Sequence, residues 1–118
     1  YLRGNRKIID RLDKLEGELT SNYICMAELY EGVARSKEHA RVESAVKQFF
    51  SGMSEVYGVD EVIAKQFGFI RAYLKKEGQV LEDIDILIGA TCAANNLTLV
   101  TLNQKHFSRI KQITLFPL

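Results

Sequence analysis

The sequence predicts an α/β fold in which helices cover both faces of a parallel sheet. Short stretches of strand-forming residues alternate along the chain with amphipathic helical stretches, an order typical of parallel sheets. The 118 residues suit a single domain spanning 1–118, and the 47% hydrophobic and 26% charged residues exclude bulk disorder. In such a fold, functional side chains gather at the carboxyl ends of strands and the amino ends of helices.

Helices are indicated wherever apolar residues recur every three or four positions. One helix has clear terminating signals, because Asp60 suits an N-cap and Gly78 suits the position after the last turn. The segment from 84 to 95 is apolar on nearly every side and is expected to be buried. The predicted helices span 6–15, 23–35, 38–50, 61–77 and 84–95.

Strands are predicted between these helices. Residues 97–101 (LTLVT) have the unbroken character of a buried strand, and a turn around 103–107 follows them. Residues 113–116 are expected to form an edge strand. The remaining predicted strands span 18–22 and 55–59.

Charge and composition narrow the kind of chemistry. Sixteen basic and fifteen acidic side chains give a net charge of +1, which does not by itself indicate a nucleic-acid binder. The longest run without a charge or an amide, 86–94, is far shorter than the about 20 residues of a membrane span. Cys25 and Cys92 have no CxxC partner, and two isolated histidines, His39 and His106, cannot build a zinc site alone. We therefore expect a cytoplasmic protein, with no membrane partner, whose chemistry rests on carboxylates.

Two aspartates stand at the start of the apolar helix. Asp83 is expected to cap it, since one capping side chain satisfies a helix start. Asp85 is then a second carboxylate in a helix otherwise made for burial, and burying a charge is costly unless a cation compensates it. The alternative is that both acids lie at the surface and simply complement the helix dipole.

Two further places could contribute oxygen atoms. Glu28 lies at the border of the apolar stripe centred on Leu29, whereas Glu31 should face water. Thr101 ends the buried strand and Asn103 follows it, at the edge of the sheet where sites form. Taken alone, Glu28 is more simply a solvated glutamate and Asn103 an ordinary turn residue.

Three segments of the chain match motifs of a known family. Residues 27–32 read AELYEG, residues 83–91 read DIDILIGAT and residues 97–107 read LTLVTLNQKHF. In this order and spacing they resemble the AELxxG, DxDxLIAAT and LxLVTx(D/N)xxHF segments of PIN-domain nucleases, particularly the toxin branch called VapC. Residues 2–5 (LRGN) are similar to the stretch that follows the family's first strand.

The resemblance implies a three-layer α/β/α domain with a parallel sheet and a metal-dependent endoribonuclease activity. Carried over by position, Glu28 and Asp85 match family acids, Asp83 an accessory acid, and Asn103 a position held by Asp or Asn. The implied ligands of Mg²⁺ or Mn²⁺ are Asp85, Glu28 and Asp83, and the implied catalytic residues are Glu28, Asp85 and Asn103. The family's first aspartate and its central strand have no counterpart, so we expect this chain to be N-terminally truncated relative to the family.

The resemblance also implies partners. These are RNA, with structured tRNA among the candidates, and a small antitoxin protein. On the helix after Asp60, a core stripe is expected from Ile63, Phe67, Ile70 and Leu74. A two-fold homodimer is expected through the second apolar stripe of that helix, Val62, Phe69 and Tyr73. The basic side chains nearest the site by position are Arg3, Arg6, Lys7, Arg35, Lys37 and Lys105.

Two other functions compete with this one. The missing aspartate favours a catalytically defective PIN-fold module that binds RNA or protein. A small phosphatase would require a nucleophilic aspartate directly after a strand, whereas residues 83–85 begin a helix.

Overall fold

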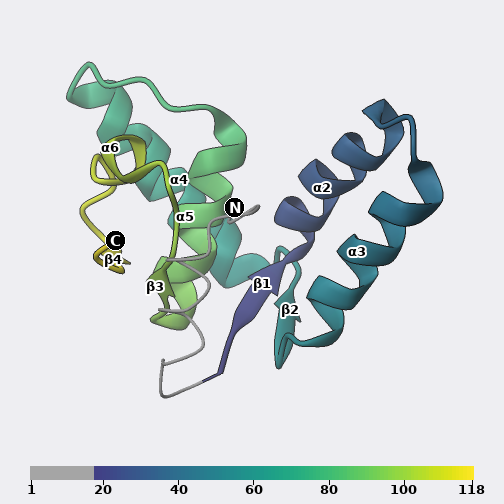
Figure 1. The fold of residues 1–118 in the computed structure, drawn as a ribbon. Coiled ribbons are helices and arrows are strands. Elements are labelled where there is room, and N and C mark those ends of the chain that lie inside the picture. The colour runs from purple at the N-terminus through teal and green to yellow at the C-terminus, as the bar shows by residue number, and fades with distance from the viewer. Residues whose placement is uncertain (1–17) are drawn as a thin grey trace. The chain divides into compact units, whose positions relative to one another are not determined.

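The computed structural model describes residues 18–118, which divide between two compact units (Figure 1). We call Glu18–Val59 the hairpin unit and Asp60–Leu118 the C-terminal unit, and describe each by itself. The predicted helix 6–15 and the basic residues Arg3, Arg6 and Lys7 lie outside the described residues.

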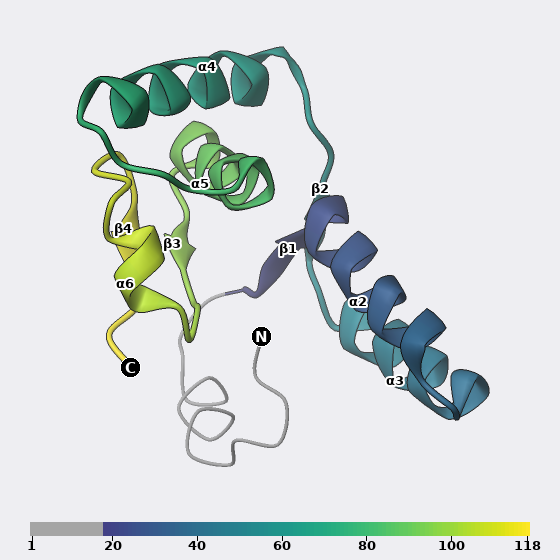
Figure 2. The same cartoon turned by 90° about the horizontal axis from the view of Figure 1, so that it is seen from above.

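Along the chain of the hairpin unit, two helices follow the first strand and precede the second. It contains β1 (Thr20–Asn22), α2 (Tyr23–Arg35), α3 (His39–Ser51) and β2 (Glu55–Tyr57). The strands pair in parallel, with Thr20 opposite Glu55 and Asn22 opposite Tyr57. The two helices lie side by side, as Figures 1 and 2 both show.

A small apolar core holds the hairpin unit together. Val33 of α2 packs with Val46 and Phe50 of α3. The side chain of Asn22 starts α2, because its Oδ1 accepts a hydrogen bond of 2.8 Å from the backbone N–H of Cys25. Partly buried side chains surround this core: Met26, Leu29, Tyr30, Val42, Met53 and Val56.

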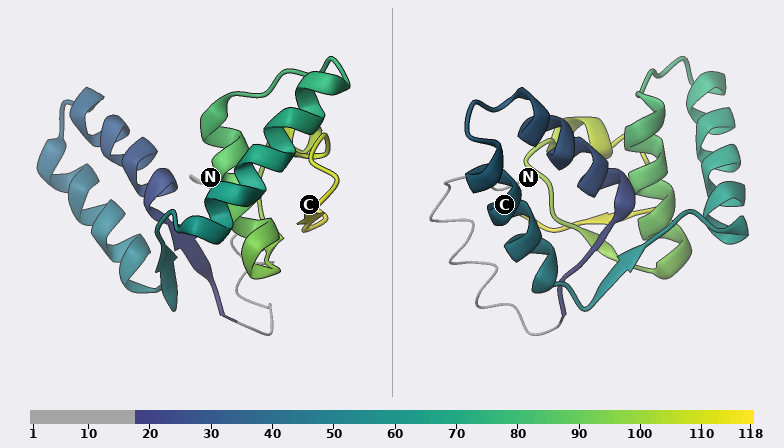
Figure 3. Two further views of the ribbon diagram at one scale, coloured as in Figure 1. Left: turned by 180° about the vertical axis from the view of Figure 1, so that it is seen from behind. Right: turned by 90° about the vertical axis from the view of Figure 1, so that its right-hand side faces the viewer.

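The C-terminal unit is built on two helices, α4 (Glu61–Lys76) and α5 (Asp83–Asn95), which pack against each other (Figures 2 and 3). The remaining elements are β3 (Thr98–Leu99), α6 (Gln104–Phe107) and β4 (Thr114–Leu115). The strands β3 and β4 pair in parallel.

The interior of the C-terminal unit explains the apolar pattern of both helices. Ile63, Ile70 and Leu74 of α4 are almost fully buried, as the predicted stripe requires. On α5, Ile86 and Ala90 are buried to the same degree. A β-carbon at Gly89 would lie 2.5 Å from Cδ1 of Ile110, so the glycine allows the segment after α6 to approach α5 closely.

The ends of α4 follow the sequence signals. The Oδ1 atom of Asp60 accepts a hydrogen bond of 2.9 Å from the backbone N–H of Ile63. At the other end, Gly78 has φ of 68°, and the N–H groups of Gly78 and Gln79 donate to the carbonyl groups of Lys75 and Leu74. This is the Schellman arrangement, which suits glycine because it needs a positive φ.

The predicted elements within residues 18–118 are confirmed in type, and their bounds differ by a few residues. Helix 23–35 has the predicted bounds, whereas α3 begins and ends one residue later than predicted. The strands are shorter than expected, since residues 97–101 contribute only Thr98–Leu99, and the expected turn at 103–107 contains the single-turn helix α6. The parallel pairing is confirmed within each unit. None of the helices within residues 18–118 has the length and apolar character needed to cross a bilayer.

The N-cap of α4 gives a direct test of this fold. Replacing Asp60 with Ala removes the acceptor for the Ile63 N–H and should lower the free energy of unfolding by about 0.5–2 kcal/mol. Asp60→Asn keeps an acceptor oxygen and should retain most of that stability. Urea unfolding of the three proteins checks this, and equal losses in both variants would show that the cap bond does not stabilise α4.

Candidate active site

Asp85 lies in the first turn of α5, where the helix is partly covered. The α5 sequence carries charge only at Asp83 and Asp85, and from Ile86 onward most of its side chains are buried. Because the helix is apolar on nearly every side, neighbouring elements cover most of it, including part of its first turn. Asp85 is therefore half-buried, while Glu82 and Asp83 are exposed.

The environment of Asp85 disfavours its negative charge. Burial raises the pKa of the Asp85 carboxyl group above its usual value, and the charge of Glu82 raises it further. His106 is close enough to act in the opposite direction. A cation beside Asp85 would reverse this balance, because an opposite charge within a few ångströms favours the ionised form.

The prediction that Asp83 caps α5 is wrong. Glu82 occupies the N-cap position without a capping hydrogen bond from its side chain, and Asp83 is the first residue inside the helix. From there its Oδ1 accepts a hydrogen bond of 2.9 Å from Nε of Arg71, which links α4 to α5. Both side chains are substantially exposed, so this ion pair contributes at most about 1 kcal/mol.

Polar side chains organise the segment that follows β3. The backbone N–H of Asn103 donates to Oγ1 of Thr101 at 3.1 Å, and Thr101 is buried. Nε2 of Gln104 donates to the carbonyl groups of Thr101 at 2.7 Å and of Phe116 at 3.2 Å. These bonds fix the loop between β3 and α6 against the chain end that follows β4.

His106 connects the two predicted site segments of the C-terminal unit. Its Nδ1 lies 2.7 Å from Nδ2 of Asn103, and the ring lies near the carboxyl group of Asp85. Sequence reasoning excludes a zinc site at His106 and gives the residue no other role. Its position three residues after Asn103, in the same motif, is the available signal, because residues three apart meet on one side of a helical turn.

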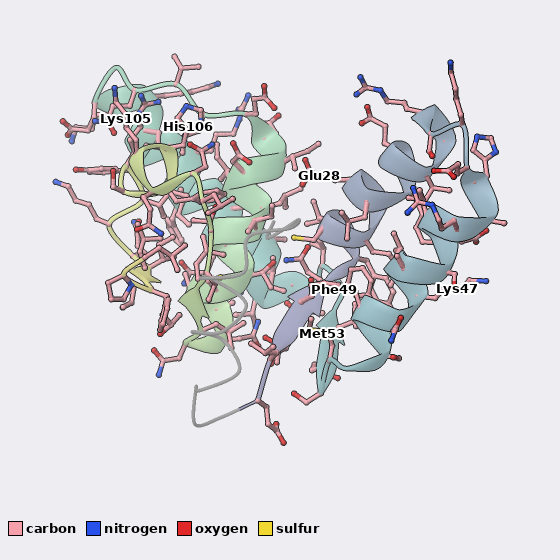
Figure 4. The ribbon with its side chains drawn as sticks, viewed as in Figure 1. Glu28, Lys47, Phe49, Met53, Lys105 and His106 are labelled. Atoms are coloured by element: carbon pink, nitrogen blue, oxygen red, sulfur yellow. The ribbon has the colours of Figure 1, made fainter. Side chains whose placement is uncertain are left out.

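Glu28 belongs to the hairpin unit. It lies in the middle of α2, is exposed as the border position predicted, and is labelled in Figure 4. Burial raises the pKa of the nearby Cys25 thiol, and the charge of Glu28 raises it further. Glu31 faces water and pairs with Arg35 at 3.6 Å, as the helical pattern predicted. The structure thus holds Asp83, Asp85 and Asn103 in one unit and Glu28 in the other.

The donor set suits a hard divalent cation but is incomplete among the described side chains. Within residues 18–118, no three His, Cys, Asp or Glu side chains gather closely enough to hold a metal ion. The predicted ligands Asp85, Glu28 and Asp83 offer carboxylate oxygens, which Mg²⁺ and Mn²⁺ prefer. Of the predicted ligands, the C-terminal unit holds Asp83 and Asp85.

The predicted RNA-binding lysines within residues 18–118 and two of the three predicted dimer residues lie at the surface. Lys37 and Lys105 are exposed, and Figure 4 labels Lys105 beside His106 on α6. Of the predicted dimer stripe, Val62 and Phe69 are 55% and 69% exposed. Tyr73 is half-buried, and the Nζ atom of Lys111 lies 5.3 Å from its ring centroid.

Comparison with known proteins identifies the family. The PIN domain model matches residues 3–113. Ribonuclease VapC1 of Methanocaldococcus jannaschii is 34% identical over 105 residues, which are 89% of this chain and 73% of that protein. The tRNA(fMet)-specific endonuclease VapC of Shigella flexneri is 26% identical over 101 residues, covering 86% of this chain and 76% of that protein.

A solved structure agrees with these relatives. VapBC-1 from nontypeable Haemophilus influenzae matches with a TM-score of 0.88 and 29% identity, covering 98% of this chain and 89% of that one. The predicted PIN-like α/β fold with parallel strands is thereby confirmed. The chain belongs to the PIN-domain family, within its VapC-like branch.

Proposed function

We propose that this chain is a metal-dependent endoribonuclease and the toxin of a toxin–antitoxin pair. The observation that carries this proposal is the match of residues 3–113 to the PIN domain, together with the half-buried carboxylate of Asp85 in the first turn of α5. Burial raises the pKa of that carboxyl group, and a bound cation would favour its charged form. The family and the ribonuclease names of its relatives support RNA as the substrate.

The proposed roles follow the chemistry of each side chain. Asp85 and Glu28 would hold Mg²⁺ or Mn²⁺, with Asp83 as an accessory acid, and Asn103 would orient the site through its amide oxygen. When bound, such a cation orients water for attack on a phosphodiester and neutralises charge on the phosphate. Phosphate contacts would come from exposed cations, with Arg35, Lys37 and Lys105 as the described candidates.

The proposed partners follow from the relatives. The tRNA-specific relative supports structured tRNA as one candidate substrate. The likeness to VapBC-1 supports a small antitoxin protein as the partner. A cytoplasmic location remains the prediction made from the sequence.

Cleavage of RNA should require both a divalent metal and the two principal acids. Asp85→Asn and Glu28→Gln each remove a charged ligand while keeping side-chain size, and each should lower the cleavage rate by at least about 100-fold. A gel assay with Mg²⁺ or Mn²⁺ measures this, and Glu31→Gln, on the water-facing side of α2, is the matched control.

Three outcomes are informative. Full cleavage in excess EDTA would contradict the metal dependence. Full cleavage by Asp85→Asn would contradict its role as ligand. RNA binding without cleavage by the unaltered chain would favour the alternative, a PIN-fold binding module.

The raised pKa of Asp85 predicts a pH-dependent effect on stability. An acid whose pKa is higher in the folded state destabilises the fold once it ionises. This penalty is absent below the ordinary pKa of about 3.9 and grows as the pH rises through the raised pKa. Asp85→Asn should therefore gain stability relative to the unaltered chain between acidic and neutral pH.

Urea unfolding in EDTA, over the pH range in which both proteins fold, measures that difference. Adding Mg²⁺ at neutral pH should then stabilise the unaltered chain and leave Asp85→Asn unchanged, because a ligand stabilises only the state that binds it. A stability difference that does not vary with pH would contradict the assigned environment of Asp85.

We also propose a homodimer through Val62, Phe69 and Tyr73. The exposure of Val62 and Phe69 supports it, since such apolar patches commonly mark interfaces. Phe69→Glu should shift the mass measured by light scattering from dimer to monomer. Val80→Glu, at an exposed apolar position outside this stripe, should leave the mass unchanged. A monomeric unaltered chain would remove this interface.

A further inference from the structure

The side chain of Asn103 contacts His106 instead of capping α6. Asn103 stands at the N-cap position of α6 but makes no capping hydrogen bond with its side chain. Its amide nitrogen Nδ2 lies 2.7 Å from Nδ1 of His106 instead. Among residues 18–118, Oδ1 of Asn103 accepts no hydrogen bond, so the amide oxygen is the group left for the site.

The chemistry of the two groups determines which atoms meet. The amide nitrogen can only donate, so Nδ1 of His106 is the acceptor in this contact. The backbone around this pair is fixed, because the N–H of Asn103 is bonded to the buried Thr101. The side chain of Asn103 can still rotate, and its contact with His106 restricts that rotation.

The ring of His106 also lies near the carboxyl group of Asp85. The first turn of α5 and the loop before α6 are separated by the whole length of α5 and by β3. One imidazole ring therefore lies beside both predicted oxygen donors of the C-terminal unit.

We propose that His106 is a positioning residue of the candidate nuclease site, which fixes the Asn103 amide group so that Oδ1 is the atom presented to the attacking water or the substrate. This inference rests on the proposed function of that site. Without His106 the amide rotates freely and presents its NH₂ group for part of the time. An NH₂ group can neither accept a proton from water nor approach a cation favourably.

Three variants separate positioning from other roles. His106→Phe removes the acceptor and keeps a ring, whereas His106→Gln keeps an acceptor oxygen within reach of Asn103. His39→Phe changes the other histidine, which is exposed on α3, and serves as the control. Since His106 is also exposed, all three proteins should fold, and thermal unfolding verifies this.

The kinetic expectation is a loss in kcat with KM for RNA unchanged. His106→Phe should lower kcat by about 10–100-fold, the usual effect of removing a group that orients a site residue. His106→Gln should recover most of that loss, and His39→Phe should match the unaltered chain. In an Asn103→Asp background the loss caused by His106→Phe should shrink to less than about 3-fold, because a carboxylate has two equivalent oxygens and needs no orientation.

A spectroscopic measurement tests the same claim without activity. In the unaltered chain, the NMR signals of the Asn103 side-chain amide should be displaced from those of solvent-exposed asparagines. They should move to the exposed range in His106→Phe and stay displaced in His39→Phe. Unchanged Asn103 amide signals in His106→Phe would overturn the positioning role, as would an equal kinetic loss in the unaltered and the Asn103→Asp backgrounds. If the unaltered chain cleaves no RNA, the proposed function fails while the amide signals still decide the role of His106.

Discussion

The burial of α5 is the constraint on which the rest of the C-terminal unit depends. Its residues from Ile86 to Cys92 are mostly inaccessible to water, with Ala90 and Ile86 among the most buried. An apolar helix of this kind is stable only when other elements cover it, and α4 and the segment around Ile110 do so. The one polar part of α5 is its first turn, where the packing leaves Asp85 half-covered.

That constraint gives Asp85 its chemical character. Had the first turn been fully exposed, Asp85 would be a solvated carboxylate like Asp83, which only pairs with Arg71. Partial burial and the charge of Glu82 raise the pKa of the same group, so its charged form is costly and would be favoured by a nearby cation. The packing that stabilises the C-terminal unit therefore also raises the free energy of the ionised Asp85 carboxylate.

Much of this can be predicted from the sequence. Residues that cap or end helices act through their immediate neighbours, so the predicted roles of Asp60 and Gly78 are confirmed. Apolar periodicity predicts the buried face of α4 at Ile63, Ile70 and Leu74. The motif residues Asp85 and Asn103 can be found because their type and spacing are local features of the chain.

The features that the sequence does not reveal depend on contacts between distant segments. Asp83 is predicted to be the cap because nothing local indicates Arg71, which lies twelve residues earlier on another helix. His106 has no predicted role because its effect on Asp85 exists only once β3 and α6 are folded against α5. The shortening of the strand at 97–101 also depends on pairing with β4, which a propensity argument does not measure.

The ionisation of Asp85 is the most direct measure of the link between packing and metal binding. The pKa of its carboxyl group can be followed by ¹³C NMR in EDTA and again in the presence of Mg²⁺. We predict a pKa above the usual aspartate value of about 3.9 without metal, and a marked fall when Mg²⁺ is added. A pKa at or below the usual value that Mg²⁺ does not change would contradict the claim that Asp85 is held for a cation.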